Sequence, residues 1–204
     1  MKKPRVNVYV ILDRSSSMQS CQFATQSGFN EYVEKLKQDK KTDYRLWLTQ
    51  FNESVEKTYE GVKLDGVELN YQPNGMTALY DAVCGTLKGI EDAKAKSIVV
   101  IMTDGEENSS KEFKQADMNA LIKKLEAKKN WTFVYLGANQ DAIKTAVSFG
   151  ISAGNAATFN STTGGMGATF KAMATSTMIF ANASPATTSN YFSSAQQDEI
   201  QSAK

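Results

Sequence analysis

Residues 8–18 read VYVILDRSSSM, an apolar run that ends in one acid, Asp13, followed by an arginine and three serines in succession. The run is short, rich in β-branched residues and without polar alternation, which is typical of a strand buried on both faces. Strands of that kind occur in parallel sheets that are covered by helices on both sides. The stretch therefore predicts an α/β protein, and it leaves the acid and the serines to be explained.

The same two patterns recur along the chain. Strand-like apolar stretches occur at residues 6–12, 45–51, 97–102 and 131–136, with a short one at 156–159. Apolar residues with helical spacing occur at residues 29–36, 79–90, 118–125, 139–149 and 170–181. This alternation predicts a Rossmann-like, doubly wound α/β fold, with a mostly parallel sheet of about six strands and helices on both faces.

Residues 54–70 depart from that pattern because polar and apolar residues alternate there. Asp65 and Gly66 within this segment favour a tight turn. We therefore expect an antiparallel edge strand or a hairpin at residues 54–70.

The length of 204 residues and the hydrophobic fraction of 41% fit one globular domain. We expect a single domain over residues 1–182 and a polar tail over residues 183–204, either mobile or held by a partner. Tyr191 and Phe192 stand in this tail, and the sequence leaves open whether they dock on a neighbour or fold back onto the domain.

Composition also argues against several partners. The formal net charge is +1 and no long basic run is present, so we expect neither nucleic acid nor a membrane as a partner. The first apolar run is broken by Asn7 and leads into Asp13, which favours a strand over a secretory signal. Cys21 and Cys84 are too few for a disulfide framework, so we expect a cytoplasmic protein.

The sequence contains no histidine. Serine and cysteine nucleophiles that rely on an imidazole base are therefore excluded, and so are imidazole-based zinc sites. Any metal bound by this chain must be held by oxygen.

Three groups of small oxygen-bearing residues lie at strand ends or in adjacent loops. Asp13, Ser15 and Ser17 follow the first strand, Asp104 follows the strand at 97–102, and Thr77 precedes the helix at 79–90. Ligands bind beyond the carboxyl ends of strands in open α/β sheets, and alternate residues of an extended loop point the same way. Carboxylate and hydroxyl oxygens suit a hard cation such as Mg²⁺.

The motifs DRSSS at 13–17, NGMT at 74–77 and TDG at 103–105 together resemble the metal-ion-dependent adhesion site of von Willebrand factor A domains. The resemblance covers about residues 5–182. The stretch YLGANQDA at 135–142 also resembles small stand-alone A-domain proteins of bacteria and phages.

The resemblance implies that Ser15, Ser17 and Thr77 bind a cation directly, and that Asp13 and Asp104 bind it directly or through water. The cation would be Mg²⁺, or Mn²⁺ or Ca²⁺, and an Asp or Glu of a protein partner would complete its shell. This is a non-enzymatic binding mechanism with no bond-breaking step.

Two positions differ from the family pattern. Ser16 stands where the family most often has glycine between the serines, and Met76 stands where glycine usually precedes the threonine. We expect Ser16 to be tolerated if its φ is not positive, and Met76 to reshape the rim of the site.

Simpler interpretations exist for each motif. An acid and serines after a strand are also common at turns and helix N-termini. Residues 106–108 would either contribute to the rim of the site or repel acidic partners, or simply form a solvated loop, which is the interpretation we favour. Asp81 would either orient Thr77 or complement the helix dipole.

Two other functions remain open at this point. An aspartate-based, metal-assisted phosphohydrolase also has an acid at the end of its first strand, but its second acid would stand where this chain has Ser15, and no phosphate-binding glycine motif is present. Alternatively, the protein self-associates, with the tail or an exposed acid of one copy at the metal site of the next.

Overall fold

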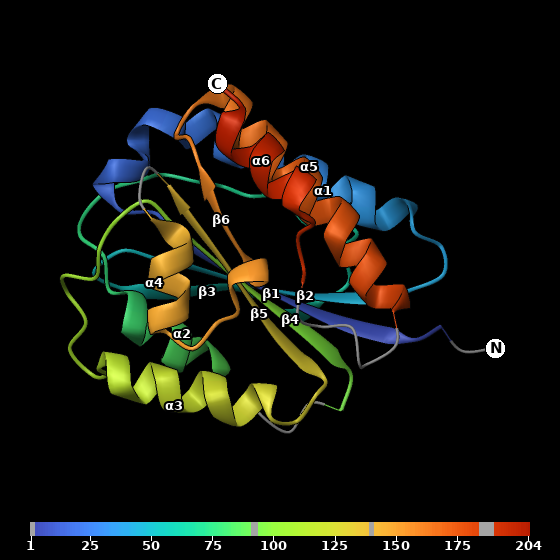
Figure 1. Ribbon diagram of the computed structural model, residues 1–204, viewed down its shortest axis with the longest axis horizontal. Coiled ribbons are helices and arrows are strands. Elements are labelled where there is room, and N and C mark those ends of the chain that lie inside the picture. The colour runs from blue at the N-terminus through green and yellow to red at the C-terminus, as the bar shows by residue number, and fades with distance from the viewer. Residues whose placement is uncertain (1–2, 91–93, 139–140, 184–189) are drawn as a thin grey trace.

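The computed structural model describes residues 3–90, 94–138, 141–183 and 190–204. Its centre is a six-stranded sheet of order β3-β2-β1-β4-β5-β6, in which β3 is antiparallel to β2 and the other pairs are parallel (Figure 1). The strands are β1 (Arg5–Asp13), β2 (Asp43–Phe51), β3 (Val55–Val62), β4 (Lys96–Thr103), β5 (Trp131–Ala138) and β6 (Ala156–Phe159). The predicted fold class is confirmed.

Helices cover both faces of the sheet (Figure 1). One face packs against α1 (Gln22–Gln38), α5 (Thr163–Asn182) and α6 (Ser194–Ser202). The other face packs against α2 (Leu79–Leu87), α3 (Gln115–Glu126) and α4 (Ala142–Ser148). Two short 3₁₀ helices, η1 (Ser16–Cys21) and η2 (Ala153–Asn155), complete the described elements.

The central strand β1 shows why its sequence is apolar almost throughout. Val8 and Val10 point into the core on the α1 side, whereas Tyr9 and Ile11 point into the core on the α2 side. Every residue of β1 after Arg5 is buried, because parallel strands in the middle of such a sheet are covered on both faces. The strand thus delivers Asp13 to the carboxyl edge of the sheet.

The edge strand lies at the start of the segment where it was expected. Strand β3 pairs with β2 through a turn at residues 52–54, and its register shifts between Leu46 and Thr49. Asp65 and Gly66 do not join two strands, although Gly66 has the positive φ of 74° that suits a turn. Of the two expected forms, the structure therefore has the edge strand and not a second hairpin.

The predicted helix at 139–149 is shorter in the structure, where α4 begins at Ala142 and the residues 139–140 lie outside the described part of the chain. Asp141 caps it by accepting a hydrogen bond from the Lys144 amide at 3.0 Å. The helix ends at Ser148, and Gly150 follows with a φ of 87°, as its predicted role at the C-terminal end requires.

The described residues of the C-terminal segment, 190–204, fold back onto the domain and do not form a separate tail. Tyr191 and Phe192 are buried, and Ile200 on α6 is completely buried against the core. The Tyr191 hydroxyl lies 2.6 Å from Thr177 Oγ1 on α5. The apolar contacts of these few side chains outweigh the polar composition that had suggested a tail.

An aromatic stack lies in the middle of the sheet on the α2 side. Tyr9 stands between Trp47 and Trp131, with ring centroids 4.5 Å and 5.4 Å away. Burial raises the pKa of the Tyr9 hydroxyl to about 12. Both tryptophans of the chain therefore belong to one cluster.

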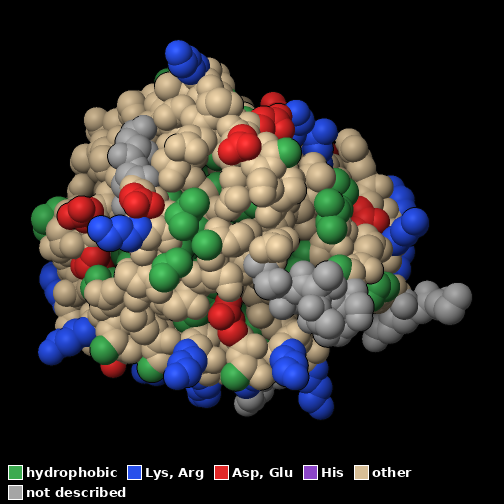
Figure 2. All heavy atoms as spheres, viewed as in Figure 1, with side chains coloured by type: hydrophobic (Ala, Val, Ile, Leu, Met, Phe, Trp, Pro, Cys, Tyr) green, Lys and Arg blue, Asp and Glu red, His purple; other side chains and the backbone are tan. Residues whose placement is uncertain are grey.

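On the face shown in Figure 2, acidic and basic side chains are interspersed and neither sign forms one continuous patch. None of the helices in the described ranges has the length and apolarity needed to cross a membrane.

Candidate functional site

Asp13 ends β1 as a fully buried carboxylate. Its Oδ1 accepts a hydrogen bond from the Ser15 amide at 2.7 Å, and its Oδ2 accepts one from Thr103 Oγ1 at 2.5 Å. These two donors fix the orientation of the carboxylate at the carboxyl edge of the sheet. Thr103 had been noted only as part of the TDG motif, so its direct contact with Asp13 is a feature that sequence reasoning missed.

The serines of DRSSS face alternately, as expected. Ser15 Oγ lies 3.0 Å from Ser17 Oγ, and Ser17 Oγ donates to Asp104 Oδ1 at 2.6 Å. Ser16 is exposed and uses its backbone amide to bond the Gly75 carbonyl at 3.1 Å. Two of the three serines thus join the cluster, and the middle one attaches the loop to residues 74–77.

Thr77 completes the cluster from a third segment. A methyl carbon built on Gly105 would lie 3.0 Å from Thr77 Oγ1 and 3.7 Å from both Asp13 Oδ2 and Ser17 Oγ. Oxygens from the loop after β1 and from the segment before α2 therefore surround one point above Gly105, and Asp104 adjoins them through its hydrogen bond with Ser17. The structure brings together all five predicted residues, namely Asp13, Ser15, Ser17, Thr77 and Asp104.

In the described part of the chain, the two carboxylates have no cationic partner. Among the described residues, no lysine or arginine forms an ion pair with Asp13 or Asp104. Burial raises the pKa of Asp13 to about 6, although hydrogen bonds from Thr103 and Ser15 oppose that change. Burial also raises the pKa of Asp104. The site therefore holds negative charge that nothing in the described part of the chain neutralises.

This donor set fits a hard dication. Neighbouring ligands of an octahedral ion with bonds of about 2.1 Å lie about 3.0 Å apart, and the Ser15 and Ser17 hydroxyl oxygens are 3.0 Å apart. Over the described residues, no group of three or more His, Cys, Asp or Glu side chains is placed to hold a metal. A cation here would thus depend on two carboxylates and three hydroxyls, which is a set that suits Mg²⁺.

Two residues of the loop after β4 hold Thr77 and the start of α2. Asn108 Oδ1 accepts a hydrogen bond from the Thr77 amide at 2.9 Å, and Glu107 Oε2 accepts one from the Tyr80 amide at 3.0 Å. Glu107 also accepts from the amides of Ser109 and Ser110 at 2.9 Å and 2.7 Å. The expectation that residues 106–108 are merely a solvated loop is therefore wrong for Glu107 and Asn108, whose side chains satisfy backbone donors that lack helical partners.

Asp81 lies in the first turn of α2, where an acid complements the helix dipole, as one of its two expected roles requires. Its carboxylate accepts hydrogen bonds from the amides of Lys111, Glu112 and Phe113, at 2.7 Å, 3.0 Å and 2.8 Å. It therefore fastens the loop after β4 to α2, and it supports Thr77 only through that loop.

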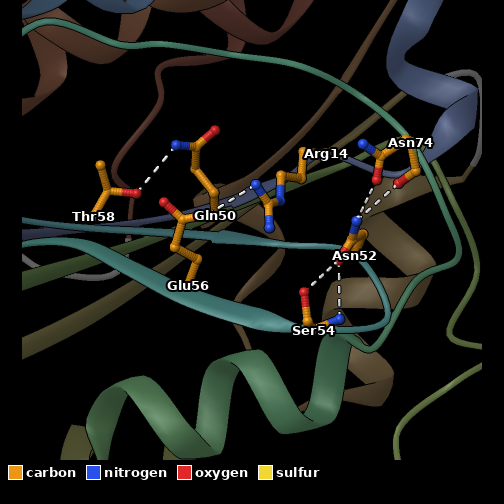
Figure 3. Close-up of polar contacts among 7 residues, drawn as sticks. All are labelled: Arg14, Gln50, Asn52, Ser54, Glu56, Thr58 and Asn74. Atoms are coloured by element: carbon orange, nitrogen blue, oxygen red, sulfur yellow. Dashed lines mark hydrogen bonds and ion pairs between the residues drawn. The ribbon is translucent and has the colours of Figure 1, made fainter.

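A second support joins the turn after β2 to residue Asn74, three residues before Thr77 (Figure 3). Asn52 Nδ2 donates to Asn74 Oδ1 at 2.6 Å, and Asn52 Oδ1 accepts from the Ser54 amide at 2.9 Å. Arg14 pairs with Glu56 on β3 at 2.9 Å (Figure 3). Sequence reasoning did not identify Asn52, because one asparagine after a strand is an ordinary turn residue.

No family model matches the sequence, and no curated protein matches it either. Among solved structures, the chain is similar to the vWF domain of the type V pili tip protein Mfa5 from Porphyromonas gingivalis. The identity is 12%, the match covers 90% of this chain and 98% of that one, and the TM-score is 0.66. The protein has the von Willebrand factor A fold.

Two further solved structures are similar to this chain and share the von Willebrand factor A fold. One is proximal thread matrix protein 1 from the mussel byssus with a zinc-occupied MIDAS motif, at 17% identity, 83% and 47% coverage and a TM-score of 0.59. The other is manganese-loaded TRAP protein from Plasmodium vivax, at 18% identity, 76% and 68% coverage and a TM-score of 0.56. The present chain spans about half the length of the mussel protein.

Ser16 and Met76, the two residues that differ from the family pattern, lie in different surroundings in the structure. Lys129 is the only non-glycine residue in the described ranges with a positive φ, so Ser16 is accommodated without backbone strain. Met76 is 55% exposed, and its amide donates to Glu53 Oε2 at 2.9 Å. Met76 thus places an apolar side chain on the surface beside Thr77.

Proposed function

We propose that the protein is a non-enzymatic interaction module that binds an acidic side chain of a protein partner through a divalent cation. Asp13, Ser15, Ser17, Thr77 and Asp104 would hold the cation, which we take to be Mg²⁺, with Mn²⁺ or Ca²⁺ as alternatives. The bound cation supplies a positive charge with room for an outside carboxylate.

The observation that carries this proposal is the convergence of Asp13, Ser17 and Thr77 oxygens on the point above Gly105, with Asp104 bonded to Ser17 beside them. Its two acids are buried or half-buried and have no basic partner in the described residues. Such an arrangement is costly unless a cation compensates it.

Each residue has a distinct part in this proposal. Asp13 is oriented by hydrogen bonds from Ser15 and Thr103, and its carboxylate supplies negative charge to the site. Ser17 and Asp104 are joined by a hydrogen bond, so the loops after β1 and β4 are already in place before a cation arrives. A site that is positioned in advance loses less conformational entropy on binding.

The burial of Asp13 also supports a binding role over an aspartate nucleophile. Its side chain has no exposed surface, and each of its oxygens already accepts a hydrogen bond. A substrate phosphorus atom would have to reach a carboxylate that the fold encloses.

The three adjacent serines offer a matched test. We expect Ser15→Ala and Ser17→Ala to weaken Mg²⁺ and Mn²⁺ binding about tenfold or more, measured by titration calorimetry. Ser16→Ala changes the same group one residue away, on a side chain that faces outward, and should bind as wild type does. Equal effects at all three positions, or a wild-type protein that binds neither cation, would contradict the site.

The partner is tested separately. Proteins captured from a host lysate on immobilised wild-type protein in Mg²⁺ should elute with EDTA, and folded Ser15→Ala protein should not retain them. Capture that survives both EDTA and the substitution would refute the cation-bridged mechanism.

A further inference from the structure

A pocket of about 360 Å³ adjoins the candidate metal site. Such a volume lies at the small end of the ~300–1,000 Å³ that is usual for ligand pockets. Gly105 lines this pocket and also lies under the point where the site oxygens converge. The pocket and the site are therefore neighbours on the same edge of the sheet.

The pocket is built by the start of α2, the loop after β4, the start of α3, strand β5 and the last turn of α4. Figure 1 shows the loop after β4 passing beside α4 and α2. Its walls include the rings of Tyr80, Tyr135 and Phe149. Phe149 meets Tyr80 and Tyr135 edge to face, with centroid distances of 6.4 Å and 5.7 Å. The wall is thus a packed aromatic cluster.

The charged side chains that line the pocket are acidic. Glu106 and Glu107 line it, and no lysine or arginine among the described residues does. Glu107 is held by hydrogen bonds from the Tyr80 and Ser110 amides, whereas Glu106 is exposed. Carboxylates that line a pocket attract a cationic side chain through ion pairing, and the half-buried Tyr80 ring adds a surface for cation–π contact.

We infer that this pocket receives a lysine or arginine side chain of the same partner segment whose acidic residue binds the cation. The inference rests on the proposed function, because it takes the partner's acid to lie at the metal site. Since successive residues of an extended segment are ~3.3 Å apart, the basic residue should stand within about two positions of the acid. The partner motif is then an acid with a neighbouring base.

Peptide binding tests the motif. The probes are short capped peptides with one glutamate and with lysine, norleucine or a second glutamate two positions away. In Mg²⁺ the lysine peptide should bind about three- to fivefold more tightly than the norleucine peptide, and the second glutamate should weaken binding. Added salt should reduce the advantage of lysine, and EDTA should abolish binding of all three.

Variants assign the preference to the pocket. Glu106→Gln should remove the advantage of lysine while norleucine binding stays unchanged. Glu68→Gln is the matched control, because this exposed glutamate lies beside Tyr59 on β3, at the other end of the sheet. Ser148→Lys, on the α4 wall of the pocket, should reverse the preference and favour the second glutamate.

A further measurement needs no metal. In EDTA, N-acetyl-lysine methylamide should cause saturable chemical shift changes at the amides of Gly105, Glu106 and Ser148, and the norleucine analogue should not. Absence of these changes would overturn the proposal that the pocket binds a lysine side chain, whether or not the protein binds a cation.

The two proposals fail differently. Equal binding of lysine and norleucine peptides in Mg²⁺, still abolished by EDTA, would overturn the basic pocket and leave the cation site standing. Lysine-specific shifts without EDTA-sensitive peptide binding would overturn the cation bridge, and with it the paired motif.

Discussion

The substitution Asp13→Asn should stabilise the metal-free protein and abolish cation binding. The buried Asp13 carboxyl has a pKa of about 6 in the folded protein, against 3.8 as its ordinary value. At ~1.4 kcal/mol per pH unit, this difference of about two units means that folding costs about 3 kcal/mol at neutral pH. Asparagine avoids that cost, since its Oδ1 can still accept from the Ser15 amide while its Nδ2 donates to Thr103 Oγ1.

The pH dependence of this effect has a definite sign. Below pH 3.8 the Asp13 carboxyl is protonated in both folded and unfolded states, so it causes no difference between wild type and Asp13→Asn. As pH rises toward about 6, the unfolded chain releases the proton and the folded protein retains it, so wild type loses stability relative to the variant. Above about 6 the full difference is present.

Urea unfolding in EDTA at several pH values measures this difference. Comparing wild type with Asp13→Asn isolates one carboxyl from the others that titrate in the same range. Adding Mg²⁺ should then stabilise wild type but not the variant, because ligand binding to the folded state raises its stability. A variant that is less stable than wild type at neutral pH in EDTA, or a difference that does not change with pH, would refute the reasoning.

Four further substitutions have expected outcomes. Gly28→Ala places a methyl carbon 2.3 Å from the Phe170 ring and should cost about 1–3 kcal/mol of unfolding free energy. Gly167→Ala, also helical but with open space around it, should instead gain about 0.5–1 kcal/mol in the same urea titration. Ile200→Ala should lower the free energy of unfolding by about 2–4 kcal/mol because that side chain is fully buried, and a neutral result would mean that α6 does not pack as described. Gly105→Ala should leave urea unfolding nearly unchanged but weaken Mg²⁺ binding about tenfold, and unchanged calorimetric binding would contradict the position of the site.

Much of the fold could be predicted because the strands β1, β4 and β5 in the middle of the sheet are buried on both faces. That condition produces a continuous apolar run, as at Tyr9 and Ile11, which is visible without any knowledge of distant contacts. The C-terminal segment lacked such a signal. Its α6 helix buries Ile200. The helix also contacts the domain through polar side chains, and one example is Gln196 Nε2, which donates to Ser176 Oγ at 3.0 Å.

The candidate site could be predicted from the order of its oxygen-bearing residues along the chain. Its supports could not, because they depend on hydrogen bonds between residues far apart in sequence. Asn108 reaches the Thr77 amide and Asn52 reaches Asn74, across separations of 31 and 22 residues. Such contacts leave no periodic trace in a single sequence.

The stack of Tyr9 between the two indoles has a practical consequence for spectroscopy. Tyr9 precedes Asp13 by four residues on one strand, so the emitting cluster lies about 13 Å from the carboxyl edge at ~3.3 Å per residue. Intrinsic fluorescence should therefore report loss of the folded sheet and respond little to an ion arriving at the edge. Melting curves recorded with and without Mg²⁺ can then be compared on one optical baseline.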